Sequence, residues 1–167
     1  MLAGVQWLRL QCETRDKRYV YQTDRNALSS LRRMKASLFS IPVRDQTSAL
    51  RFYTEKLGFV KQQDVPLGGD NRRLTEVARE WPDGPELLLE PAPLHFEPTR
   101  TYQDALTAAG IPWTQFDVGD VEGEYERLRG LDVDFSTPPT VMGPLKVAVF
   151  NDTCGNLIQL VEELDVD

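Results

Sequence analysis

The feature that most constrains the fold of this chain is an internal repeat. Four residues of the first copy recur with similar character at one constant spacing, and a longer stretch near the end of the copy recurs at a slightly shorter spacing. The matched positions are Val43, Asp45, Leu50 and Tyr53 with Val118, Asp120, Tyr125 and Leu128, and residues 84–89 with residues 155–160. Self-similarity at a fixed spacing indicates two copies of one structural unit. A single copy would cover only one face of its sheet, so we expect the two copies to pack together.

The first copy has the pattern of a strand, a helix and three further strands. Residues 37–43 alternate as a strand, and Asp45 is placed to cap an apolar helical stripe that Gly58 ends. Turn-forming residues then separate strands expected at residues 59–65, 73–78 and 86–90. The first copy is therefore a βαβββ module.

The second copy repeats this order. Strands are expected at residues 111–118, 133–135, 146–150 and 157–161, with Asp120 capping the helix between the first two. Pro138 and Pro139 are expected to turn the chain before the third strand. We predict an α+β fold in which two tandem βαβββ modules form a cupped mixed sheet.

Charge divides the chain into a basic leader and an acidic body. The net charge is -7, from 19 basic and 26 acidic residues. Residues 1–35 contain 8 of the basic and 3 of the acidic residues, so the remainder carries 11 basic and 23 acidic residues. We predict a basic, partly ordered N-terminal extension over residues 1–33. A single domain follows over residues 34–167, with module one at 35–90 and module two at 111–163.

The acidic body argues against nucleic acid as a partner, because nucleic-acid binding depends on neutralising phosphates with Lys and Arg. No stretch approaches the roughly 18 apolar residues of a membrane span. Cys12 and Cys154 are too few for a disulfide framework, which favours a reducing compartment. We therefore expect a cytoplasmic protein with no membrane partner.

The motifs within the repeats resemble the vicinal oxygen chelate superfamily, which comprises glyoxalases, bleomycin resistance proteins and dioxygenases. In the first copy the resemblance rests on IPVRDQ from Ile41 and on ALRFYTEKLGF from Ala49. In the second it rests on residues 116–120, 124–128 and 150–160, so about residues 35–163 are covered. The resemblance implies two βαβββ modules around one site, commonly in a homodimer. It implies no single activity, because members include lyases, isomerases, dioxygenases, thiol transferases and metal-free drug-binding proteins.

The resemblance also implies four metal-ligand positions, which correspond to Leu38, Leu88, Trp113 and Gln159. Leucine offers no donor atom, and an indole N–H can only donate a hydrogen bond, so Gln159 alone retains a ligand oxygen. A divalent transition metal normally draws three or more ligands from imidazole, carboxylate or thiolate groups. We therefore expect no bound metal and no cofactor.

Strand alternation brings further residues to the face of these four positions. If Phe39, Ile41 and Val43 pack beneath the helix, the residues between them face the cup. The expected ligand-binding residues are Leu38, Ser40, Leu88, Trp113, Gln115 and Gln159. An apolar floor with an aromatic ring and a few polar groups suits an organic molecule. In the alternative interpretation, Trp113 and Leu38 simply pack together and fill this space.

Three other residues carry groups that could bind a metal or take part in catalysis. Glu90 shares the face of Leu88 and could supply a carboxylate, although a glutamate at a strand end is more often solvated. His95 is the only histidine, and its proline-rich surroundings favour a solvated connector residue over a displaced ligand or general base. Cys154 has no basic sequence neighbour, which favours a neutral turn cysteine.

These observations favour a metal-independent small-molecule-binding protein of the glyoxalase/bleomycin resistance type. The ligand is expected to be neutral or cationic, because the acidic body repels anions. The alternative is a metal-dependent lyase or dioxygenase of the same superfamily with non-standard ligands, recruited from Glu90, His95, Gln159 or a partner chain. A homodimer is expected, because open sheet edges invite pairing. The sequence indicates neither catalytic residues nor the identity of the ligand.

Overall fold

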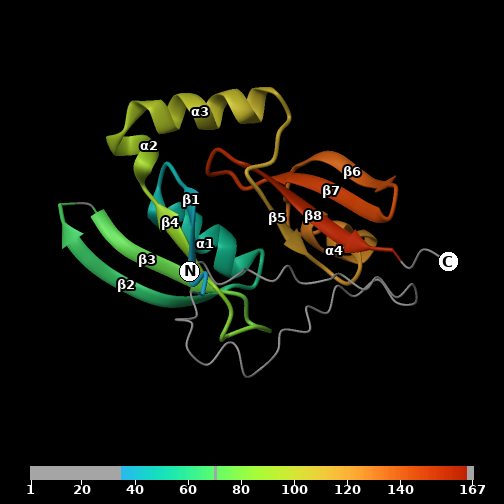
Figure 1. Cartoon of the computed structure of the whole chain (residues 1–167), viewed down its shortest axis with the longest axis horizontal. Coiled ribbons are helices and arrows are strands. Elements are labelled where there is room, and N and C mark those ends of the chain that lie inside the picture. Colours follow the sequence, from blue (N-terminus) through green and yellow to red (C-terminus); the bar gives the residue numbers. More distant parts are fainter. Residues whose placement is uncertain (1–34, 70, 165–167) are drawn as a thin grey trace, which may run out of the picture. The chain divides into compact units, whose positions relative to one another are not determined.

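The computed structural model describes residues 35–69 and 71–164, and these form the predicted tandem of modules. The first module runs in the order β1 (Leu38–Pro42), α1 (Gln46–Glu55), β2 (Val60–Gly68), β3 (Asn71–Val77) and β4 (Glu86–Glu90). The second runs in the order β5 (Thr114–Asp117), α4 (Val121–Arg129), β6 (Phe135–Met142), β7 (Leu145–Asn151) and β8 (Leu157–Glu163). Between them lie α2 (Ala92–His95) and α3 (Glu97–Ala108), shown at the top of Figure 1. The predicted α+β class and module order are confirmed.

Each module has its own four-stranded mixed sheet, and the two sheets have the same topology. The strand orders are β1-β4-β3-β2 and β5-β8-β7-β6. In each sheet the first strand is parallel to the last, and the other pairs are antiparallel. Ser40 pairs with Leu88 in the first sheet, and Gln115 pairs with Gln159 in the second. Ser40 and Gln115 are separated by one spacing of the sequence repeat, and Leu88 and Gln159 by the other. Equivalent residues therefore pair with each other in the two sheets.

Local sequence signals explain where the main helices begin and end. The Asp45 carboxylate accepts a hydrogen bond from the Ser48 amide at the start of α1. Asp120 accepts one from the Gly123 amide at the start of α4, at 3.0 Å. These are the two predicted N-caps, and each satisfies a backbone N–H that the first turn leaves without a partner. Gly58 has φ of 77°, the left-handed conformation that suits a glycine after a helix.

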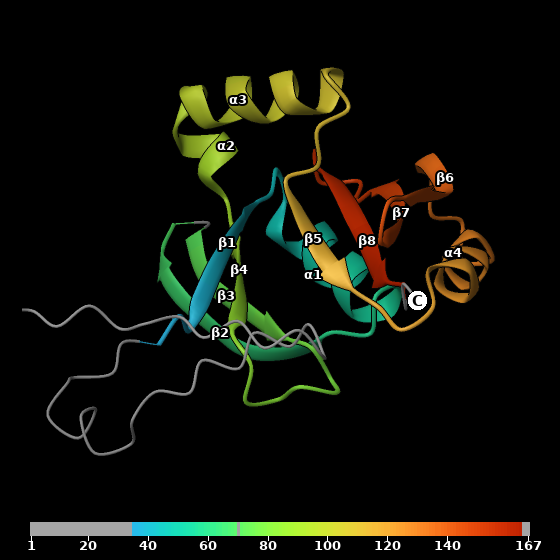
Figure 2. The same ribbon diagram turned by 45° about the vertical axis from the view of Figure 1, so that its right-hand side comes forward.

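One hydrophobic core joins the two modules. Figure 2 shows α1 between the sheets, where its Phe52 ring lies 6.2 Å from the Phe150 ring of β7. Phe59 and Phe116 make a second aromatic contact between the modules, at 5.3 Å between ring centroids. The same core takes in residues from the helix-facing side of both sheets: Ile41, Leu74, Leu87, Leu89, Ile158 and Leu160. The opposite sheet faces are therefore the ones that can present a site.

Two expectations about local structure were wrong. Pro138 and Pro139 do not turn the chain but lie within β6. This is possible because β6 is the edge strand of its sheet, and its register shifts between Thr137 and Thr140, so the missing amide hydrogens disrupt no ladder on the open side. The segment around His95 is not a plain connector, because it forms the short helix α2.

The described elements all belong to one compact unit, residues 36–167. The expected basic extension, residues 1–33, lies outside the described residues. None of the described helices is long and apolar enough to span a bilayer.

Candidate functional site

Module one brings three of the six predicted ligand-binding residues together. Ser40 and Leu88 are directly opposite each other on the parallel strands β1 and β4, and Leu38 is two residues before Ser40 on the same face. Ile41 and Leu89, on the other face, are 1% and 0% exposed, whereas Ser40 is exposed and Leu88 half-buried. The predicted alternation is therefore correct for this sheet.

Module two brings the other three residues together in the same way. Gln115 of β5 is opposite Gln159 of β8, and the Trp113 amide donates to the Leu157 carbonyl one step earlier along the ladder, at 2.8 Å. Gln115 is exposed, and Gln159 is half-buried. The Gln115 side chain donates to Asp117, another residue of this face, at 3.4 Å. The result is a polar face next to one indole ring.

The two groups of residues meet at Trp113. Its indole nitrogen lies 3.4 Å from the Ser40 carbonyl oxygen, so the start of β5 reaches the free edge of β1. The indole also packs against the shared core and stacks edge-on with Tyr102 of α3, at 5.8 Å between ring centroids. Trp113 is thus partly used for packing, as the alternative interpretation required, and it also contacts the Ser40 backbone.

Phe39 departs from the expected packing. It shares the helix-facing side with Ile41, yet its side chain is 52% exposed. Strand alternation assigns a residue to a face but does not ensure that the helix is long enough to cover it.

The described residues form surface depressions of about 430 and 370 Å³, and the larger is lined in part by Asp117, the hydrogen-bond partner of Gln115. The larger is lined by residues 117–119 and 161–163 at the ends of β5 and β8. The smaller is lined by polar groups that include Arg44, Thr107 and Asn151. None of the six predicted ligand-binding residues lines either depression.

The face of module one also carries three polar residues that the sequence did not single out, Gln63, Thr75 and Arg73. Gln63 of β2 is opposite Thr75 of β3, and Thr75 is opposite Leu88. Arg73 donates to the side-chain oxygen of Gln63 at 3.0 Å, and the side-chain nitrogen of Gln63 lies 3.5 Å from the Glu86 carboxylate. Alternation from Leu88 back through β4 and β3 was the signal that could have located them.

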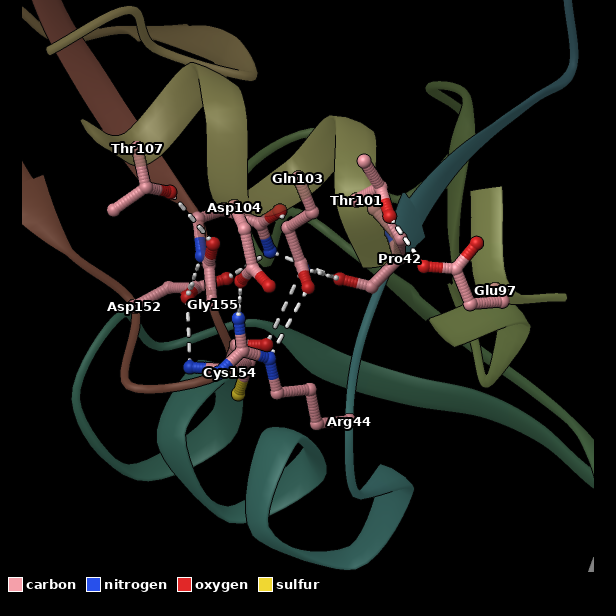
Figure 3. Close-up of polar contacts among 11 residues, drawn as sticks. Pro42, Arg44, Glu97, Thr101, Gln103, Asp104, Thr107, Asp152, Cys154 and Gly155 are labelled. Atoms are coloured by element: carbon pink, nitrogen blue, oxygen red, sulfur yellow. Dashed lines mark hydrogen bonds and ion pairs between the residues drawn. The ribbon is translucent and has the colours of Figure 1, made fainter. Parts of the chain in front are cut away.

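The connector helix α3 is held by a buried side chain, Gln103. Its amide nitrogen contacts the carbonyl oxygens of Pro42 at 3.0 Å and Cys154 at 3.3 Å, and the side-chain oxygen of Asn156 at 2.9 Å. Arg44 donates to the Gln103 oxygen at 3.3 Å, and Figure 3 shows this network beneath α3. Gln103 is 1% exposed and is the buried residue of α3, so hydrogen bonds rather than apolar burial position this helix. They also place Tyr102 against Trp113.

The β7–β8 loop beneath α3 has a buried acid at its centre. Asp152 is fully buried and accepts hydrogen bonds from the amides of Cys154 and Asn156 and from the Tyr53 hydroxyl. Burial raises the pKa of Asp152, although the hydrogen bonds from Asn156 and Tyr53 oppose this, and burial raises the pKa of Tyr53 well above its ordinary value. Burial and the nearby Asp152 raise the pKa of the Cys154 thiol to about 12. These groups build the loop and are poorly suited to acid–base or nucleophilic chemistry near neutral pH.

The comparison of the sequence with known families decides the classification. The sequence profile described as "Glyoxalase/Bleomycin resistance protein/Dioxygenase superfamily" matches residues 35–160. This chain belongs to that superfamily. Its vicinal oxygen chelate fold is the one that the repeat, the mixed sheets and their register had indicated.

Known proteins similar to this chain match it over more than three quarters of its length. The uncharacterized protein YurT of Bacillus subtilis (strain 168) is 49% identical over 130 residues, which are 78% of this chain and 100% of YurT. The crystal structure of UcmS2 has a TM-score of 0.67 and 34% identity, covering 79% of this chain and 100% of UcmS2. The structure of TnmS3, an antibiotic binding protein from Streptomyces sp. CB03234, has a TM-score of 0.61 and 25% identity, covering 80% of this chain and 98% of TnmS3.

The metal-dependent members of the superfamily need a donor set that these positions do not provide. Of Leu38, Leu88, Trp113 and Gln159, only Gln159 offers an oxygen atom, and its strand neighbour is another amide, Gln115. No three His, Cys, Asp or Glu side chains are grouped to hold a metal in the part of the chain that the structure describes. The residues present therefore do not fit the metal of the superfamily.

The two other potential metal ligands, Glu90 and His95, belong to different elements. Glu90 is at the end of β4 opposite Pro42, half-buried and on the face of Leu88. His95 ends α2 and is exposed.

Proposed function

We propose that this protein binds a small organic molecule without a metal ion. The single observation that carries the proposal is the donor set at the ligand positions of the superfamily: two leucines, one indole and one carboxamide. Such a set cannot hold a divalent cation, but it can contact an organic surface through apolar and aromatic groups and orient it with an amide. The predicted binding residues remain Leu38, Ser40, Leu88, Trp113, Gln115 and Gln159.

Two further observations support a ligand of this kind. TnmS3, which shares the fold at 25% identity, is named as an antibiotic binding protein. The described residues carry an excess of acidic side chains within a chain of net charge -7, which favours neutral or cationic molecules over anions.

We also propose a homodimer that forms through the open edges of the sheets. Hairpins at the edges of both sheets carry exposed apolar residues, with Val65 and Leu67 on β2, and Val141 and Met142 on β6. These four side chains are 47–67% exposed. Apolar groups on edge strands favour association, since both the side chains and the free backbone edge gain partners. Light scattering coupled to size-exclusion chromatography would test this, and a monomer at micromolar concentration would reject it.

The binding proposal is tested by calorimetric titration with a panel of aromatic and cationic compounds, with and without EDTA. We expect at least one compound to bind with an affinity that EDTA does not change. Trp113→Ala should weaken this binding, whereas Trp81→Ala serves as a matched control, because Trp81 is 63% exposed and lies in the β3–β4 turn. Absence of binding across the panel would contradict the proposal.

Elemental analysis separates this function from the alternative. Protein purified without chelator should contain no stoichiometric transition metal. One equivalent of Ni, Zn, Fe or Mn would instead support a metal-dependent lyase or dioxygenase with non-standard ligands.

A further inference from the structure

The centre of the module-one face contains a hydroxyl that has no partner among the described residues. Thr75 lies on β3 directly opposite Leu88, so it shares the face of the predicted ligand-binding residues. The residue is 0% exposed, and its Oγ1 atom makes no hydrogen bond within the described part of the chain. A buried hydroxyl almost always has a partner, because leaving it without one opposes folding. An unpaired hydroxyl on a candidate binding face is therefore a group that a ligand could complete.

A weak side-chain contact between Gln63 and Glu86 passes over Thr75. Gln63 belongs to β2 and Glu86 to β4, and β3 lies between these strands in the sheet. The contact between the Gln63 amide and the Glu86 carboxylate therefore crosses over β3 on the face of Thr75. At 3.5 Å this contact is at the long limit for a hydrogen bond, so it is easily exchanged for a better one.

The charged residues around the Gln63–Glu86 contact indicate which chemical group of a ligand would replace the Gln63 amide. Glu86 and Glu90 both lie on the module-one face, and Arg73 supplies the guanidinium that the structure describes there. Arg73 is engaged with the Gln63 oxygen at 3.0 Å, which leaves the Glu86 carboxylate with the long Gln63 contact. A cationic N–H donor to a carboxylate makes a shorter and stronger hydrogen bond than a neutral amide does. A protonated amine can thus displace the Gln63 amide from Glu86.

We propose that Thr75 and Glu86 form a subsite for a protonated amine of the ligand, which displaces the Gln63 side chain. The ammonium group donates to the Glu86 carboxylate and to the Thr75 hydroxyl oxygen, and Gln63 swings aside with Arg73. Leu38 and Leu88 lie beside the subsite on the same face and contact the hydrocarbon part of the ligand. This inference rests on the proposed binding function and narrows its ligand to an amine-bearing organic molecule.

The test compares two probes that differ in the charge of the amine, tryptamine and N-acetyltryptamine. Binding of each to the full-length ¹⁵N-labelled protein is followed by chemical-shift titration. We expect tryptamine to bind at least about tenfold more tightly, since a hydrogen bond to a charged group contributes at least a factor of this size. The largest shifts should lie on β3 and β4 around Thr75.

Three variants assign this preference to the subsite. Glu86→Gln should remove the tenfold preference, whereas the control Glu80→Gln, which makes the same charge change at an exposed turn residue, should keep it. Thr75→Val should weaken tryptamine binding about fivefold or more and Thr75→Ser should restore it. Thr75→Val should also raise the urea midpoint of the ligand-free protein, because it removes an unpaired hydroxyl. A hydroxyl with a structural role would give the opposite change in midpoint and would overturn the proposal.

The subsite and the proposed function fail in distinguishable ways. Equal binding of the two probes, or shifts confined to other strands, overturns the subsite but leaves small-molecule binding in place. Absence of binding by both probes also overturns the amine subsite, and the wider compound panel then decides the proposed function separately.

Discussion

The carboxyl group of Glu76 is buried on the helix-facing side of the first sheet. Glu76 is opposite Leu87, is 0% exposed, and neither carboxyl oxygen has a hydrogen-bond partner among the described residues. Burial raises its pKa from 4.5 to about 8. An unpaired carboxylate in apolar surroundings is costly, so the folded protein keeps the proton at neutral pH.

This shift has a definite effect on stability. The folded pKa is raised, so the contribution of Glu76 is fully present below pH 4.5 and is lost as the pH rises to about 8. Over this window the unfolded chain ionises while the folded chain does not. Each pH unit therefore lowers the free energy of unfolding by about 1.4 kcal/mol, for a total on the order of 5 kcal/mol.

Glu76→Gln should remove this dependence, because the amide does not ionise. Urea denaturation of the wild-type chain and the variant at pH 5, 7 and 9 measures the difference in unfolding free energy at each pH. We expect the unfolding free energy of the variant, relative to that of the wild type, to increase by roughly 3 kcal/mol or more between pH 5 and pH 9. The exposed Glu80→Gln serves as control and should follow the wild type. A difference between Glu76→Gln and wild type that stays constant with pH would refute the reasoning.

Three further predictions concern the buried loop and its surroundings. Tyr53→Phe removes the hydroxyl that donates to the buried Asp152 carboxylate. It should lower the free energy of unfolding by about 1–2 kcal/mol in urea titrations. Gly155→Ala should destabilise the fold by about 2 kcal/mol or more, because φ is 109° and an added Cβ would lie 2.7 Å from a buried side chain of α3. The control Gly143→Ala, at φ 62° with no neighbour within 4 Å, should cost only about 1 kcal/mol, and equal costs would contradict the crowding argument. In a Cys12→Ser background, the Cys154 thiol, with its pKa of about 12, should resist Ellman's reagent at pH 8 until urea unfolds the chain, and rapid labelling of the folded protein would disprove its burial.

The repeat allowed most of the fold to be predicted, because it fixed both module order and register. Asp45 and Asp120 cap their helices as expected, since capping depends only on residues within one turn. The pairing of Ser40 with Leu88 and of Gln115 with Gln159 also follows from sequence, because side chains alternate strictly along a strand. These are the parts of the site that local rules determine.

The remaining features depend on which strands are neighbours and on what covers them. The Gln63–Glu86 contact joins the two strands that flank β3, so it could not be predicted without the sheet order. Phe39 lies on the predicted face, but coverage depends on the extent of α1. The turn expected at Pro138 was wrong because β6 is an edge strand, a property of the assembled sheet.

The buried amide of Gln103 has a consequence for how the two halves of this chain can vary. One side chain from the connector satisfies a backbone carbonyl at the end of β1 and another in the β7–β8 loop. A sequence change in either half must therefore remain compatible with the other, even though each half has its own complete sheet. The two modules share one architecture, but this side chain ties the position of each module to the position of the other.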